Sequence, residues 1–156
     1  MSTIIPFFPY RLFFLYIEPV SALAGAFYAA FMPRSYLNDL SFGPVRPFTY
    51  LTPTQTTMAL FQLANLYFLF ALNEHFVLSS TNSLKTWRRL LAGLLVADIG
   101  HLISMAPAGY DIFWRVDQWN AMAWGSVGFV YLGATTRICF LTGVGLKNTG
   151  DRSKKE

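Results

Sequence analysis

Long apolar runs separated by short polar stretches make up most of the chain. Four of them reach the roughly 20 residues that an α-helix needs to cross a bilayer, at about 9–32, 54–78, 84–105 and 119–146. A backbone exposed to lipid must satisfy its own hydrogen bonds, so each run predicts a helix. The pattern therefore predicts an all-α fold, a four-helix transmembrane bundle formed by residues 1–156 as a single domain.

Prolines interrupt or end two of these runs. Pro33 ends the first span, and the third span ends before Pro107. Glu18-Pro19 interrupts the first apolar run, whereas the apolar region of a cleaved signal peptide is normally uninterrupted, so we expect a retained span. Pro19 has no backbone N–H, which leaves the carbonyl of Leu15 without its usual donor. The connection 33–53 is a candidate lid over the bundle mouth, with a passive surface loop as the alternative.

Composition and charge indicate a membrane protein and its orientation. Of the 156 residues, 54% are hydrophobic and 13% charged, against about a quarter charged in a soluble domain. Four spans place both termini on one side, which holds eight of the twelve Lys and Arg residues, against three on the other side. By the positive-inside rule both termini are predicted to be cytoplasmic, in an integral protein of the endoplasmic reticulum. No basic patch interleaved with aromatic residues is present, so nucleic acid is not an expected partner.

Several ionisable and amide side chains fall inside the predicted spans. Such groups are costly in hydrocarbon, and each is therefore a candidate functional residue. At about 1.5 Å per residue, their depths predict two layers. The cytoplasmic half holds Glu18, Glu74 and Arg137, and the distal half holds Asp98, His101, Asn65 and Gln62.

Helical spacing predicts which of these side chains share a face. Asp98 and His101 are three residues apart, as are Gln62 and Asn65, so the members of each pair lie on one face. Glu74 is nine residues from Asn65, which is half a turn, so we expect it to reach toward the cytoplasmic interface instead. Helical spacing also predicts two stripes, each formed by residues on one face of a helix. On the first helix the small residues Ala22, Gly25 and Ala29 follow Glu18. On the fourth helix the stripe is polar or aromatic and consists of Asn120, Trp124, Tyr131 and Thr135.

Structural roles remain open for most of these groups. Glu18 and Arg137 are either a structural ion pair or part of a catalytic site, and Asp98 with His101 is either a catalytic pair or a polar clamp between helices. The amides of Gln62 and Asn65 also suit interhelical hydrogen bonds. His75 is expected to be solvated at a helix end, Asp117 to cap the fourth helix, and Cys139 to be a core residue. With one Asp-x-x-His pair only, no metal site is predicted.

Carboxylic acids and an imidazole in a cavity of low dielectric can be held in different protonation states, one as acid and one as base. This arrangement suits acid-promoted opening of an epoxide, protonation of an alkene or migration of a double bond in a lipophilic substrate. No nucleotide-binding loop, redox motif or nucleophile elbow is visible, and no cofactor is expected.

Four stretches carry a family resemblance: LFFLYIEPVSALAG, ALFQLANLYFLFALNE, WRRLLAGLLVADIGHLISM and WNAMAWGSVGFVYLGATTRICFLTGVG. They resemble a small four-span membrane protein family of filamentous fungi, over roughly residues 10–146. That family is similar to the short membrane-bound cyclases and epoxide hydrolases of fungal polyketide and meroterpenoid pathways. A more distant likeness is to the emopamil-binding sterol isomerases, from which no residues are transferred.

The residues and the resemblance together predict a membrane enzyme that opens an epoxide of a lipophilic natural product to a cyclic ether or diol. The alternative is a non-catalytic lipid- or sterol-binding protein, or a helper subunit associated with other biosynthetic enzymes. The expected catalytic residues are Asp98, His101 and Glu18. The expected substrate-binding residues are Asn65, Gln62, Trp124, Tyr131, Asn120, Glu74 and Arg137.

Overall fold

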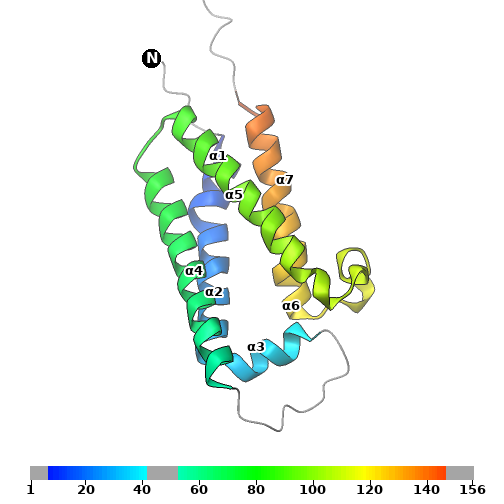
Figure 1. The fold of residues 1–156 in the computed structure, drawn as a ribbon. Coiled ribbons are helices and arrows are strands. Elements are labelled where there is room, and N and C mark those ends of the chain that lie inside the picture. The colour runs from blue at the N-terminus through cyan, green and yellow to red at the C-terminus, as the bar shows by residue number, and fades with distance from the viewer. Residues whose placement is uncertain (1–6, 42–52, 147–156) are drawn as a thin grey trace, which may run out of the picture.

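The computed structural model describes residues 7–41 and 53–146, and within them all regular structure is helical. This confirms the predicted all-α class. Figure 1 shows long helices running along one another, with the beginning of α1 and the end of α7 at the same end of the bundle.

The long helices follow the four apolar runs closely. The first consists of α1 (Phe8–Leu12), a π-helical turn (Phe13–Ile17) and α2 (Glu18–Phe31). The second and third are α4 (Thr54–Ser79) and α5 (Leu84–Met105). The fourth consists of α6 (Ala121–Ala123), a second π-helical turn (Trp124–Gly128) and α7 (Phe129–Thr142). The remaining elements are α3 (Pro33–Leu40) and the 3-10 turns Ala106–Ala108, Tyr110–Phe113 and Val116–Gln118.

Side-chain caps and one glycine define helix ends. Ser83 caps α5, because its hydroxyl accepts a hydrogen bond from the Thr86 N–H. At α6 the cap is Asn120, whose side chain accepts from the Ala123 N–H at 2.8 Å. The prediction that Asp117 is this cap was wrong, since Asp117 lies within the 3-10 turn Val116–Gln118, three residues before the cap. α7 ends at Gly143, whose φ of 88° is a left-handed conformation that suits glycine.

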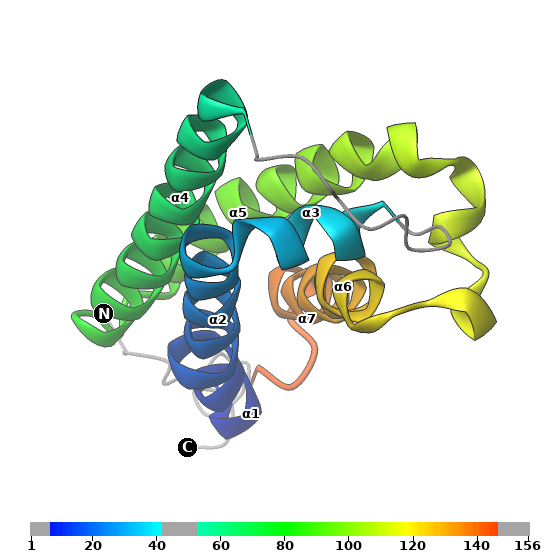
Figure 2. The same ribbon diagram turned by 90° about the horizontal axis from the view of Figure 1, so that it is seen from below.

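Two helix pairs form the body of the bundle. α2 lies beside α4 in both views, and α5 runs obliquely along α7 (Figures 1 and 2). Small residues of α2 lie at the first contact: a Cβ on Gly25 would lie 3.5 Å from the Tyr67 ring, an ordinary van der Waals distance. Contacts through small residues are typical of membrane helices, and Ala29 of the same stripe is buried.

α3 occupies part of the connection that the sequence suggested as a lid. It lies across one end of the bundle, between α2 and α6 (Figure 2). The Asp39 backbone carbonyl accepts a hydrogen bond from Nδ2 of Asn120 at 2.7 Å. The Asp39 carboxylate accepts one from the Tyr28 hydroxyl at 2.5 Å. These bonds tie α3 to the first and last long helices, while residues 42–52 of the same connection lie outside the described residues.

The bundle combines a few buried charges with an outer surface that is largely apolar. Four charged side chains are buried among the apolar core clusters, while many large apolar side chains are exposed on the outer surface of the long helices. Two helical stretches, Phe8–Phe31 and Leu84–Ala108, are long and apolar enough to cross a membrane. α4 and the last helix are less apolar because they carry amides, Glu74 and Arg137.

Candidate functional site

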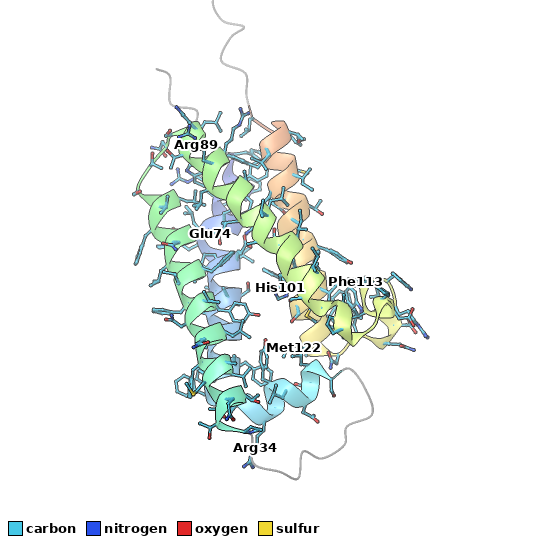
Figure 3. The ribbon with its side chains drawn as sticks, in the orientation of Figure 1. Arg34, Glu74, Arg89, His101, Phe113 and Met122 are labelled. Carbon is cyan, nitrogen blue, oxygen red and sulfur yellow. The ribbon has the colours of Figure 1, made fainter. Side chains whose placement is uncertain are left out.

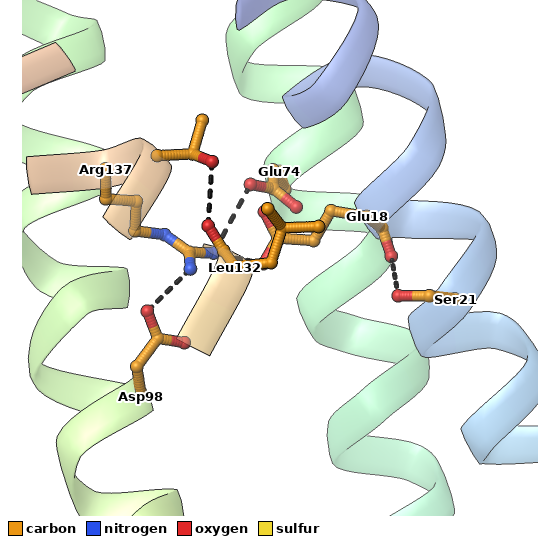
Figure 4. A network of polar contacts seen from close by, with 7 residues as sticks. Glu18, Ser21, Glu74, Asp98, Leu132 and Arg137 are labelled. Atoms are coloured by element: carbon orange, nitrogen blue, oxygen red, sulfur yellow. Dashed lines mark hydrogen bonds and ion pairs between the residues drawn. The ribbon is translucent and has the colours of Figure 1, made fainter. Parts of the chain in front are cut away.

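One arginine joins carboxyl groups from three other helices at the centre of the bundle (Figure 4). Nη1 of Arg137 on α7 donates to Oδ2 of Asp98 on α5 at 2.6 Å. Nη2 donates to Oε1 of Glu18 on α2 and lies 3.6 Å from Oε1 of Glu74 on α4. Each long helix thus contributes one charged residue. We call these four residues the charge cluster.

Burial of the charge cluster is nearly complete. Arg137 and Glu74 are 0% exposed, Glu18 is 5% and Asp98 7% exposed. The rings of Phe14 and Phe70 lie 5.7 and 5.9 Å from the guanidinium carbon. Water is therefore largely excluded, and the interactions among these charges are stronger than at a surface.

Irregular backbone positions Glu18. The π-helical turn Phe13–Ile17 ends where Glu18 begins α2, and Pro19 follows directly. The Leu15 carbonyl, which Pro19 deprives of its usual donor, lies 2.7 Å from Nδ1 of His75 on α4. A proton on Nδ1 makes this ring the substitute donor. The expectation that His75 is solvated was therefore wrong, because His75 is half-buried and satisfies the orphaned carbonyl.

Gly133 makes room for the guanidinium, a role that the sequence analysis missed. A Cβ at this position would lie 3.0 Å from Nη1 of Arg137 and 3.3 Å from Oε1 of Glu18. Gly133 is four residues before Arg137, so it lies one turn away on the same face of α7. A glycine one turn from an arginine within a long apolar run was the signal available in the sequence.

Several polar atoms of the charge cluster have no hydrogen-bond partner among the described residues: Oε2 of Glu18, both carboxyl oxygens of Glu74, and Nε of Arg137. If all three carboxyl groups were ionised, a formal charge of −2 would be buried around one guanidinium. Such an excess is very unfavourable in a medium of low dielectric. The arrangement is therefore suited to holding exchangeable protons on the carboxyl groups.

The prediction of two separate polar layers was wrong, because Asp98 joins the same cluster as Glu18 and Glu74. The depth estimate treated the helices as parallel and side chains as points. α5 instead runs obliquely to α7, and the long Arg137 side chain spans the remaining difference. Asp98 is hydrogen-bonded to Arg137 and not to His101, whose Nε2 lies 2.9 Å from the Ser126 carbonyl.

For α4 the sequence predicted correctly that Glu74 and Asn65 lie on opposite sides of the helix, but it placed the wrong one of the two inside the bundle. Glu74 and Asn65 do point in opposite directions, as their half-turn separation requires. Glu74 is the buried one (Figure 3), so its expected position near the interface was wrong. Asn65 and Gln62 are exposed, so neither contacts the charge cluster. Burying the carboxyl group is favoured because Arg137 is its counter-ion, an interaction that the uncharged amides would not gain.

The predicted polar and aromatic stripe on the last helix lies mostly outside the bundle. Trp124, Tyr131 and Thr135 are exposed, and the Tyr131 hydroxyl donates to the Phe113 carbonyl at 3.2 Å. Asn120 caps α6 and binds α3. The exposed members of the stripe therefore face away from the charge cluster.

Two apolar grooves lie on the described surface. One, of about 360 Å³, is lined by residues of α5 and the following turns, including Ile99, Ile103 and Phe113. The other, of about 430 Å³, lies between α2 and α4 and includes Phe27, Phe61 and Asn65. Neither groove includes a member of the charge cluster. Within residues 7–41 and 53–146 no group of three His, Cys, Asp or Glu side chains is arranged to hold a metal ion.

Comparison with known proteins assigns the chain to a family. The model of the family described as "Domain of unknown function (DUF7704)" matches residues 2–147, nearly the whole chain, so the protein belongs to this family. No curated protein and no solved structure matches the chain.

Proposed function

We propose that this member of the DUF7704 family is a membrane-embedded enzyme that opens an epoxide of a lipophilic natural product by acid–base catalysis. The observation that carries the proposal is the charge cluster, in which three buried carboxyl groups surround one guanidinium. A site with more carboxyl groups than counter-charges can hold a protonated acid beside an ionised base, which epoxide opening requires.

The proposal includes a bundle that crosses the membrane four times with both termini cytoplasmic, in the endoplasmic reticulum. Two helical stretches have the length and apolar character of spans. The buried charges and exposed apolar side chains of all four long helices support the same placement for α4 and the last helix. The excess of Lys and Arg on the side of the termini supports the orientation.

In the proposed reaction a protonated carboxyl group donates its proton to the epoxide oxygen while the adjacent carbon–oxygen bond breaks. An internal hydroxyl group or a water molecule attacks that carbon, and an ionised carboxylate accepts the proton that the nucleophile loses. The product is a cyclic ether or a diol. The proton returns from the second carboxyl group to the first between turnovers, so no net proton is consumed.

The geometry suggests how the roles divide. Asp98 and Glu18 are the two carboxyl groups with some exposure, so we assign them to substrate contact. Arg137 holds both by hydrogen bonds, and the fully buried Glu74 is left as a proton store. His101 is no longer assigned as the proton relay to Asp98, because its ring is bonded to the Ser126 carbonyl.

The test compares two Asp→Asn variants of the full chain in lipid vesicles supplied with an epoxidised polyene. Asp98→Asn should lower turnover about 10²–10⁴-fold, the usual contribution of a general acid or base. Asp111→Asn changes an exposed carboxyl group outside the cluster and should leave turnover unchanged. Full activity of a folded Asp98→Asn protein would remove Asp98 from the reaction.

A second function is a non-catalytic protein that binds a lipid or sterol, alone or as a helper to other biosynthetic enzymes. It is favoured by one observation: the apolar groove between α2 and α4 does not include the charge cluster. On this reading Asp98→Asn would leave ligand binding intact, and deletion in the host would cause no epoxide to accumulate.

A further inference from the structure

The outer face of α4 carries polar side chains on a surface that is otherwise apolar. Gln62, Asn65 and Asn73 are exposed. At 3.6 residues per turn they lie within about 80° of one another, on one side of the helix. Apolar residues at the same angle complete a continuous line, which we call the amide stripe: Met58, Gln62, Asn65, Leu69, Asn73 and Phe76.

The amides of this stripe are unsatisfied within one copy of the chain. All three are exposed, and no hydrogen bond joins any of them to another described residue. On the four-span placement proposed above, on which this inference rests, Asn65 is the twelfth of the 26 residues of α4 and lies near the middle of the bilayer. Lipid offers neither donors nor acceptors there, so the amides need a protein partner.

We propose that the amide stripe is the interface through which two copies of this chain pair, α4 against α4. A carboxamide group is both donor and acceptor, so a line of amides is complementary to itself. Both copies have the same orientation in the membrane, so the two-fold axis runs along the membrane normal and each stripe residue faces its own counterpart. The stripe carries no formal charge, so pairing with itself brings no like charges together.

The groove between α2 and α4 continues this surface. Asn65 belongs to both, and the groove of about 430 Å³ is bordered on α4 by Phe61 and Phe68. A second copy lying along the stripe would bring its own large apolar residues, such as Leu66, beside this opening. The amides thus specify the pairing, and the adjacent groove supplies room for apolar packing.

Cysteine crosslinking tests the interface without altering any amide. In full-length protein whose own cysteine is removed by Cys139→Ser, Leu69→Cys places one thiol on the stripe (49% exposed). The matched control is Val96→Cys, which is 69% exposed at a similar depth on the outer face of α5. Oxidation in native membranes should give a disulfide-linked homodimer for Leu69→Cys and not for Val96→Cys. No dimer, or equal crosslinking in both variants, would overturn the proposal.

Removing the amides tests what holds the copies together. The triple variant Gln62→Leu, Asn65→Leu, Asn73→Leu should raise the dimer dissociation constant about tenfold or more in lipid vesicles, as single-molecule photobleaching measures it. The control triple Val96→Leu, Ile99→Leu, Ile103→Leu should leave it unchanged. A protein that is membrane-inserted but monomeric, or crosslinked only to a different protein, would overturn the interface. Neither measurement depends on turnover, so such a result would leave the proposed catalysis standing.

Discussion

At the scale of single residues, Arg137 is the group whose loss should harm the protein most. It is the counter-ion of three buried carboxyl groups, and removing one partner of a buried ion pair typically costs about 3–5 kcal/mol. Arg137→Gln should therefore lower the folded yield in membranes. Arg137→Lys should not restore it, because one ammonium group cannot reproduce the fork of donors that reaches Asp98 and Glu18.

The carboxyl side of the cluster supplies the matched comparison. Glu74→Gln should be tolerated, since neither oxygen of Glu74 has a hydrogen-bond partner and the substitution lowers the buried negative charge. The double variant Glu18→Gln, Arg137→Gln should remain poorly folded, because Asp98 and Glu74 would still lack a counter-ion. Fluorescence-detected size-exclusion chromatography of all four variants checks these expectations. Recovery of the double variant would show that Glu18 and Arg137 form an isolated pair.

Gly133 offers a second test at the same scale. Gly133→Ala would place a Cβ 3.0 Å from Nη1 of Arg137, and overpacking of this kind typically costs about 1–3 kcal/mol. The control Gly93→Ala on α5 meets nothing within 4 Å and should leave stability unchanged or slightly improved. Thermal unfolding in detergent measures both. Equal melting temperatures for the two variants would show that the guanidinium does not need the space beside Gly133.

At the scale of elements, the link between α4 and the π-helical turn Phe13–Ile17 depends on Pro19. His75→Phe would leave the Leu15 carbonyl unsatisfied, at a cost of about 1–3 kcal/mol. Pro19→Ala restores a backbone N–H to the helix, so the same His75 change should cost less in that background. A double-mutant cycle on thermal stability measures the coupling. Additive effects would contradict the idea that His75 replaces the missing backbone donor.

The sequence was informative about helices and less so about which side of each faces inward. The lengths of the apolar runs predicted the ends of α4 and α5 to within a residue or two. This worked because caps and turns that are local in the sequence set those ends. The inward side of α4 was ambiguous, since both Glu74 and the Asn65 face carry polar groups. Only the position of Arg137 on another helix decides between them. Contacts of this kind depend on helix tilt, which a single sequence does not encode locally.

At the scale of the whole molecule, the distribution of Lys and Arg predicts which side of the membrane each terminus lies on, and this can be measured. Both described ends of the chain leave the bundle at the same end (Figure 1), as an even number of spans requires. Cytoplasmic loops carry the excess of Lys and Arg, and Lys85, Arg88 and Arg89 lie at the start of α5 on that same side. Reporter tags before Met1 and after Glu156 should therefore both report the cytoplasm.

The opposite side of the membrane gives the complementary measurement. A glycosylation acceptor inserted near Phe42, in the connection that follows α3, should be modified in the lumen of the endoplasmic reticulum, while one inserted near Asn82 should not. The two sites are separated by α4, so together they ask whether α4 crosses the membrane. Modification at both sites, or termini that report opposite sides, would make the span count odd. The charge cluster would then no longer be enclosed by four membrane helices. Both the proposed acid chemistry and the pairing through α4 assume that enclosure, so both would be contradicted.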